Sequence, residues 1–440
     1  MKRTIFILLT MLVTVLFCPF TGPVHTAQKR NVVFITVDTL RADRLGCYGY
    51  KHNTSPHIDE LVKKGVLFDD AMCNIPLTNP SFASLFTSRY PHEIGAIRNG
   101  IPMVDGVTTL ASVFQENGYY TAAILSNWPL KAHLSNLQQG FDLYEDDFEQ
   151  KRYLFVNDER DAKTVSDIAL KWLDKKPSEP FFAWIHYSDP HAPYVRHKKF
   201  LFSSELTDSA NYDSEVAYTD HHIGRLIDKM ESMGLFERSL VIFTADHGES
   251  LGEHNYTGHG RKVYQPGMQV PLAIMGPGIP SGKNEDSTVQ LLDLAPTALA
   301  YAGLAPPEKT SGADLLPAIQ GKAEFPQERT LFYETFSGAA PQIEGAEKFL
   351  TSPLYVGLRH HNIKLMYKVR YSKWERYDIK KDPAEKNNLF DVGDPEFQKE
   401  SDRLMEWYGE WEDDAVVGEI DAMTEEDRKK FEALGYIDNP

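Results

Sequence analysis

Residues 240–248 read Leu-Val-Ile-Phe-Thr-Ala-Asp-His-Gly, a short apolar run that ends in an acidic residue and a histidine. Residues 31–38, Asn-Val-Val-Phe-Ile-Thr-Val-Asp, have the same form and end at Asp38. Uninterrupted apolar runs of this length are typical of strands in a parallel sheet, which helices bury on both faces. The two stretches therefore predict an α/β fold in which two strands end in acidic side chains.

The remainder of the chain up to about residue 325 alternates similar apolar runs with amphipathic stretches. This alternation is typical of βα units around a mostly parallel sheet. We expect further strands at 121–125, 181–187 and 271–275, and helices at 58–64, 80–88, 162–175 and 214–233. After residue 325 the runs become short and are separated by turn residues, which predicts an antiparallel meander and then a helical tail. We therefore expect a large α/β domain at 30–325 and a smaller α+β subdomain at 326–440.

The first 27 residues have the layout of a secretory signal peptide. Lys2 and Arg3 precede an apolar run over residues 5–17, which is short for a membrane span. We expect the protein to be exported to the periplasm or the extracellular space, with an uncleaved N-terminal anchor as the alternative. No other stable membrane span is expected.

Composition excludes several classes of protein. The chain has 440 residues, of which 42% are hydrophobic and 25% are charged, as in a globular protein. Lys and Arg total 46 against 63 Asp and Glu, so the net charge is −17. Because nucleic-acid-binding proteins usually present a basic face, this balance argues against a nucleic-acid-binding surface. Only Cys47 and Cys73 follow the signal segment, which excludes a disulfide-rich scaffold.

Acidic side chains that follow strands are candidates for a metal site. Ligands bind at the carboxyl ends of the strands in open α/β sheets. Asp38, Asp246 and His247 stand at such positions, and two carboxylates with an imidazole suit a divalent cation. A single Asp after a strand would be explained equally well by capping of the next helix.

Thr78 has two interpretations. Pro80 fits the first turn of a helix, so Thr78 is predicted near the N-cap and its hydroxyl would cap the helix. Alternatively, the free amides and the positive end of the helix would form an anion site. A hydroxyl placed there beside a metal would be positioned to attack a tetrahedral ester.

Four motifs occur along the chain in the order VDTLRADRLGCYG (37–49), TNPS (78–81), YSDPHAPY (187–194) and DHGESLGEH (246–254). Together they resemble the motifs of the sulfatase family within the alkaline-phosphatase superfamily. The likeness extends from about residue 30 to the C-terminus. It implies an ester hydrolase with a large mixed, mostly parallel sheet flanked by helices and a small C-terminal antiparallel α+β subdomain.

The resemblance also implies roles for particular residues. Asp38, Asp246 and His247 would bind at least one divalent cation (Ca, Mn or Zn). Thr78 would be the nucleophile and a further metal ligand.

Three more residues receive roles from the same resemblance. Asn99 would bind an oxyanion of the substrate, and His191 would contact the substrate or protonate the leaving group. His259 would face the ester oxygens. Local sequence offers other interpretations, in which Asn99 is a turn residue, His191 stabilises its loop and His259 is solvated.

Several positions depart from the sulfatase pattern. Thr78 stands where sulfatases carry the Cys or Ser that matures to formylglycine, so no formylglycine is expected. Thr39 replaces the second acid of the usual pair. Phe82, Ser126 and Trp128 stand where relatives place Arg, Lys and His. Phe82 and Trp128 would either face an apolar ester arm or point into the core and leave substrate choice unaffected.

These departures shape the expected function. A formylglycine hydrate can expel sulfate by collapsing to the aldehyde, whereas a threonine ester must be released by external attack. We therefore expect a metal-dependent hydrolase of the sulfatase family that acts on a small or polymer-linked phosphate or sulfate ester. A phosphodiester or phosphonate monoester is the favoured substrate. The alternatives are a sulfuric ester hydrolase, and a phosphoryl-group transferase or catalytically degenerate anion-binding protein.

Overall fold

The computed structural model describes residues 30–148, 159–326, 328–338, 351–412, 415–419 and 423–433. The predicted signal peptide lies outside these residues. Among the helices of the described part, none is long and apolar enough to cross a membrane.

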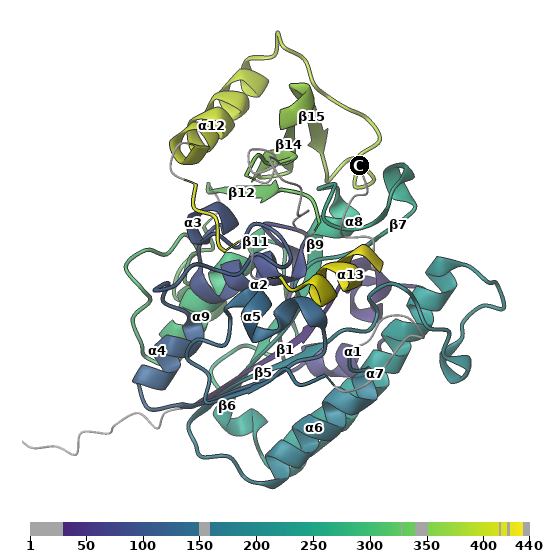
Figure 1. The fold of residues 1–440 in the computed structure, drawn as a ribbon, viewed down its shortest axis with the longest axis vertical. Helices are drawn as coiled ribbons and strands as arrows, with labels where there is room; N and C mark the ends of the chain where they lie inside the picture. Colours follow the sequence, from purple (N-terminus) through teal and green to yellow (C-terminus); the bar gives the residue numbers. More distant parts are fainter. Residues whose placement is uncertain are drawn as a thin grey trace, which may run out of the picture.

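The large domain is built on a nine-stranded mixed sheet in the order β10-β2-β9-β6-β1-β5-β3-β4, with β11 paired to β2 (Figure 1). The strands are β1 (Asn31–Val37), β2 (Gly65–Met72), β3 (Tyr120–Ile124), β4 (Leu143–Glu145), β5 (Phe181–Tyr187), β6 (Ser239–Ala245), β9 (Gln269–Met275), β10 (Lys283–Glu285) and β11 (Val289–Gln290). β1 pairs in parallel with both β5 and β6, and every residue of these three strands is buried. β9 is antiparallel to β6 and to β2. The predicted mostly parallel α/β sheet is confirmed, with β9 as its antiparallel member.

β2 is a strand that the sequence pattern does not indicate. Its register shifts between Phe68 and Ala71, where Asp69 and Asp70 occupy a bulge against β9. Because the two acids interrupt the apolar run, the segment lacks the continuous pattern of a buried strand.

Helices cover both faces of the sheet (Figure 1). On one face α6 packs against α7, and α7 packs against α1; on the other, α2 packs against α4 and α9. Their bounds are α1 (Pro56–Val62), α2 (Thr78–Thr87), α4 (Leu110–Glu116), α6 (Ala162–Asp174), α7 (Asp208–Ser232) and α9 (Leu294–Tyr301). Shorter elements are α3 (Pro91–Ile94), α5 (Ala132–Ser135), η3 (Trp128–Leu130), α8 (Gln265–Met268), α10 (Leu316–Ile319), β7 (Ser250–Leu251) and β8 (Thr257–Gly258).

The predicted C-terminal meander is confirmed as a four-stranded antiparallel sheet in the order β12-β13-β14-β15. Its strands are β12 (Thr330–Thr335), β13 (Tyr355–His360), β14 (Ile363–Lys368) and β15 (Lys373–Asp378), and α12 (Pro395–Glu412) packs against β13.

The last described helix, α13 (Glu425–Ala433), returns to the large domain. Its Asp427 carboxylate lies 3.2 Å from His133 Nε2, and Lys430 Nζ lies 3.6 Å from the ring centroid of Trp128. Thr424 caps this helix, because its Oγ1 accepts a hydrogen bond from the Asp427 amide at 3.1 Å. α13 therefore covers η3, close to the carboxyl ends of the central strands.

Candidate active site

Two buried aspartates stand side by side at the carboxyl end of the central sheet. Val37 of β1 is paired with Ala245 of β6, so the residues that follow, Asp38 and Asp246, leave neighbouring parallel strands at the same edge. Both are fully buried. The Asp38 amide donates to the Tyr187 carbonyl at 2.8 Å, which continues the β1–β5 pairing and fixes the direction of the Asp38 side chain.

His247 completes a group of three donor atoms. Its Nε2 lies 3.4 Å from Asp246 Oδ2 and 3.7 Å from Asp38 Oδ1, and one donor atom from each of the three lies within 4.8 Å of the others. His247 Nδ1 lies 2.9 Å from the Gly248 carbonyl. Since a carbonyl only accepts, Nδ1 carries the proton and Nε2 presents its lone pair to the two carboxylates.

This donor set fits a divalent cation. Asp38 Oδ1 and Asp246 Oδ2 are buried and have no hydrogen-bond partner among the described residues. Burial raises the pKa of both carboxyls, and burial together with the charge of His259 lowers the pKa of His247. Buried acceptors that face one another are unfavourable without a compensating charge. A metal ion would satisfy all three atoms, and the O, O, N set is one that Mn²⁺ or Zn²⁺ accepts.

Thr78 lies beside this group at the start of a helix. It is the first residue of α2, and Leu77 occupies the N-cap without a side-chain hydrogen bond. The predicted N-cap role for Thr78 is therefore wrong. Its Oγ1 is fully buried and lies 3.4 Å from His247 Nε2. The hydroxyl therefore lies beside the candidate metal ligands, at the positive end of the α2 dipole.

Asn99 contacts the same helix end. Its Oδ1 accepts a hydrogen bond from the Asn79 amide at 3.0 Å, which ties it to the residue after Thr78. Its Nδ2 is buried and has no hydrogen-bond partner within the described part of the chain. The side chain therefore holds a spare donor at the N-terminal end of α2.

The imidazole rings of His259 and His191 lie beyond His247 on one side of the site. The ring centroid of His259 lies 4.4 Å from that of His247, and the centroid of His191 lies 5.2 Å from that of His259. His191 is buried, and its Nδ1 lies 2.6 Å from the Ala192 carbonyl. The structure thus brings all the predicted site residues into one neighbourhood.

Three site residues were not anticipated from the sequence. Asn127 Nδ2 donates to Asp38 Oδ2, and Glu249 Oε1 lies 3.1 Å from His259 Nδ1. The charges of Glu249 and Glu159 add to the effect of burial and of Asp246 on the Asp38 pKa. Glu249 could have been found from the sequence, because it belongs to the DHGE segment that follows a predicted strand. Asn127 and Glu159 reach the site only because segments that are distant in the sequence fold together.

The structure places Phe82 and Trp128 in the interior, the second of their two interpretations, and the ester-arm role is wrong. Phe82 is fully buried, and its ring centroid lies 4.7 Å from that of Trp184 and 4.8 Å from that of His186, in the core between α2 and the sheet. Trp128 is buried under the ammonium groups of Lys131 and Lys430. Neither ring is open to an ester arm.

The family model described as Sulfatase matches residues 30–304. This chain belongs to the sulfatase family. A model described as N-sulphoglucosamine sulphohydrolase, C-terminal, matches residues 252–410 of the same sulfatase chain. The predicted family and the prediction of an ester hydrolase are confirmed.

Curated relatives of this sulfatase include an ulvan-active sulfatase of Formosa agariphila, 26% identical over 84% of this chain and 78% of the relative. An N-acetylglucosamine-6-O-sulfatase of Bacteroides thetaiotaomicron is 24% identical over 86% of this chain and 85% of the relative. Because the relatives carry sulfatase names, they support the sulfuric ester alternative better than the favoured phosphodiester.

Solved structures confirm the fold. A 2-O GAG sulfatase has a TM-score of 0.73 at 22% identity, covering 88% of this sulfatase and 93% of that chain. The phosphonate monoester hydrolase of Agrobacterium radiobacter has a TM-score of 0.71 at 20% identity, covering 87% and 96%. The fold is therefore shared by enzymes named for sulfate esters and for phosphonate esters.

Proposed function

We propose that the protein is an exported sulfuric ester hydrolase that acts on a sulfated carbohydrate, with Thr78 as the nucleophile. The observation that carries the proposal is the Thr78 hydroxyl, 3.4 Å from His247 Nε2 at the positive end of α2, beside two aspartates with unpaired oxygens. The names of the relatives, an ulvan-active sulfatase and an N-acetylglucosamine-6-O-sulfatase, support the substrate class.

Asp38, Asp246, His247 and Thr78 would hold the divalent cation. When bound, the cation would supply Lewis-acid stabilisation of the oxyanion and would lower the pKa of a coordinated hydroxyl. The sulfatase family is metal-dependent, and the three donor atoms found here form one of the candidate metal groups of the structure.

The reaction consists of two displacements at sulfur. In the first, Thr78 Oγ1 forms a bond to sulfur, its proton passes to solvent, and the sulfur–alkoxide bond breaks. The departing alcohol oxygen takes a proton from His191, and Asn99 Nδ2 donates to a non-bridging oxygen. In the second, water attacks sulfur, one of its protons returns to His191 and the other goes to the departing Thr78 Oγ1, and sulfate is released.

Glu249 orients His259 in this scheme. Its carboxylate accepts from His259 Nδ1 at 3.1 Å, so His259 Nε2 is directed away from Glu249. His259 and His247 have ring centroids 4.4 Å apart, which places His259 within reach of ester oxygens at Thr78. His259 Nε2 would then contact the ester oxygens where the Arg and Lys contacts of the sulfatase pattern are missing.

A phosphodiester or phosphonate monoester is the second candidate substrate. Thr78 cannot mature to formylglycine, so its ester must be opened by water, as in phosphoryl transfer through a simple alkoxide. The fold is also shared with a phosphonate monoester hydrolase. These two observations are the reason for a phosphodiester or phosphonate monoester as the second candidate.

The test is a panel of matched 4-nitrophenyl esters (sulfate, methyl phosphodiester, phenylphosphonate and phosphate) together with sulfated oligosaccharides, using full-length protein loaded with Ca²⁺, Mn²⁺ or Zn²⁺. We expect sulfate release from the sulfated substrates and its loss in Thr78→Ala. A preference of tenfold or more for the phosphodiester or the phosphonate over the sulfate would establish the second candidate instead.

A further inference from the structure

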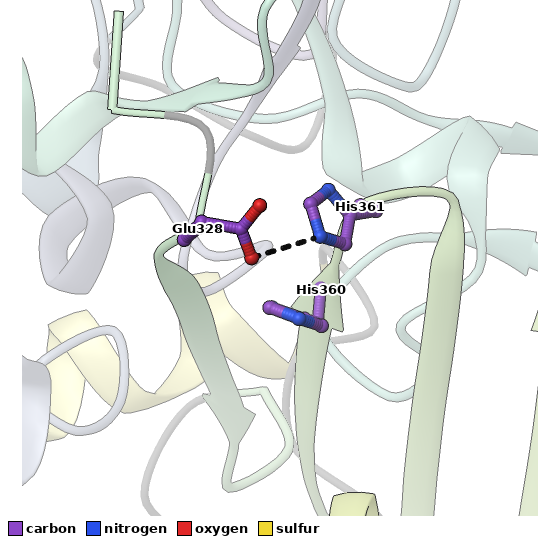
Figure 2. Close-up of side chains that lie close together, drawn as sticks. All are labelled: Glu328, His360 and His361. Atoms are coloured by element: carbon purple, nitrogen blue, oxygen red, sulfur yellow. Dashed lines mark ion pairs between the residues drawn. The ribbon is translucent and has the colours of Figure 1, made fainter. Parts of the chain in front are cut away.

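We infer that Glu328, His360 and His361 form a zinc site on the surface of the C-terminal sheet, separate from the candidate active site (Figure 2). His360 is the last residue of β13, and His361 begins the turn into β14. Thr330 of β12 is paired with His360, so Glu328, two residues before Thr330, comes to the same end of the sheet.

The spacing of the donor atoms matches a zinc ligand set. His361 Nε2 lies 3.4 Å from Glu328 Oε2, and a donor atom of His360 completes a group in which all separations are within 4.8 Å. Zinc–ligand bonds of roughly 2.0–2.2 Å in a tetrahedron place neighbouring ligand atoms about 3.4 Å apart. One pair already has this separation. The Glu328 and His361 side chains are 84% and 47% exposed, so small rotations can bring the third atom in.

The backbone holds the two imidazoles together. His361 has a φ of 49°, and its carbonyl accepts a hydrogen bond from Arg359 Nε, which fixes the turn. The ring centroids of His360 and His361 lie 4.3 Å apart. Thr330 Oγ1 lies 3.4 Å from His360 Nδ1, which leaves His360 Nε2 as the ligand atom. The turn therefore preorganises two nitrogen ligands.

Two of the nearby guanidinium groups are bound to acids, and the third, that of the exposed Arg403, donates to Thr330 Oγ1 at 2.6 Å. Arg329 lies 2.8 Å from the Asp293 carboxylate, and Arg359 lies 2.8 Å from the Asp70 carboxylate. Two imidazoles and one carboxylate select Zn²⁺ over Ca²⁺ or Mg²⁺, which prefer oxygen ligands.

A bound zinc ion would join the entry to β12 to the β13–β14 turn. It would bind the folded sheet and not the unfolded chain, and would therefore raise the thermal midpoint of the protein. The inference does not depend on the proposed function, and its test needs no substrate.

Zinc binding is measured on the metal-stripped full chain at pH 7.5 by titration calorimetry and by thermal unfolding. Asp246→Asn serves as the background, because it removes a ligand of the candidate active site. We expect this variant to bind one zinc equivalent and to gain thermal stability from zinc. Adding Glu328→Gln, His360→Ala or His361→Ala should weaken that binding by at least about tenfold, since even outer-shell changes cost that much.

Glu324→Gln and His57→Ala, which alter exposed residues outside the group, are the matched controls and should leave binding unchanged. Circular dichroism of each variant excludes misfolding as the cause of a loss. The site does not exist if the Asp246→Asn protein binds no zinc, if the three variants bind it unchanged, or if the controls lose it to the same extent.

Discussion

Without metal, Asp246→Asn is expected to make the protein more stable, although it removes a site residue. Asp38 Oδ1 and Asp246 Oδ2 are buried, unpaired within the described structure and at most 4.8 Å apart. If both carboxylates are ionised, two unit charges at 4.8 Å repel by about 3.5 kcal/mol at an effective dielectric constant of 20. Burial raises the pKa of both groups, so the repulsion is felt only to the extent that the pair has lost both protons. Asparagine has the same shape, and its Oδ1 can still accept from the Thr39 and His247 amides. Its Nδ2 can donate to the lone pair of His247 Nε2, which lies 3.4 Å from the replaced oxygen.

Bound metal should reverse the order of stability, so that the wild type becomes more stable than Asp246→Asn. A cation at about 1,000 times its Kd stabilises the wild-type protein by about 4 kcal/mol, which exceeds the repulsion removed by the substitution. Asp246→Asn lacks a ligand and should gain much less. The assay is thermal unfolding at pH 8 of protein dialysed against EDTA, with and without Ca²⁺, Mn²⁺ or Zn²⁺, and Asp293→Asn is the control because Asp293 is bound to Arg329. The reasoning is refuted if the metal-free variant is less stable than the wild type and no cation changes the order.

Three further predictions concern the nucleophile, a buried ion pair and a buried carboxyl group. Thr78→Ala should lower kcat by at least about 10³-fold, as removal of a covalent nucleophile does, while Thr78→Ser keeps measurable turnover; an Ala rate within a few-fold of wild type would assign the attack to water. Lys364 and Glu385 form a buried ion pair at 2.7 Å, so Lys364→Met should cost about 3–5 kcal/mol and Lys364→Met/Glu385→Gln should recover part of it, as measured by urea unfolding. Burial raises the pKa of Asp220 to about 7, so the folded state keeps a proton that the unfolded state releases, and the free energy of unfolding should fall between about pH 4 and 7. Asp220→Asn should flatten that slope in urea titrations at pH 5 and 8; an unchanged slope would show that Asp220 is ionised in the folded protein.

The central strands and their acids were predictable because the signal is local. A continuous apolar run followed by an acid places Asp38 and Asp246 at strand ends, and the parallel pairing of β1 with β6 then brings them together. β2 was not predicted, because Asp69 and Asp70 interrupt its apolar run. The two acids lie at a register shift that is defined only by the pairing of β2 with β9.

The direction of a side chain was not predictable where both sides of an element are apolar. All ten residues of α2 are buried, so periodicity cannot distinguish a Phe82 that faces the substrate from one that packs on Trp184. Asn127 reaches Asp38 across 89 positions of sequence, and Glu328 meets His361 only because β12 pairs with β13. Such contacts depend on non-local pairing.

The contact of α13 with the large domain makes the candidate metal site depend on a distant surface helix. Lys430 Nζ lies over the ring of Trp128, the residue after Asn127, and the Asn127 side-chain amide donates to Asp38. If α13 detached, Trp128 would lose this cover and the segment that carries Asn127 would be less restrained. The position of a metal-facing carboxylate is therefore sensitive to changes on a helix that contributes no ligand.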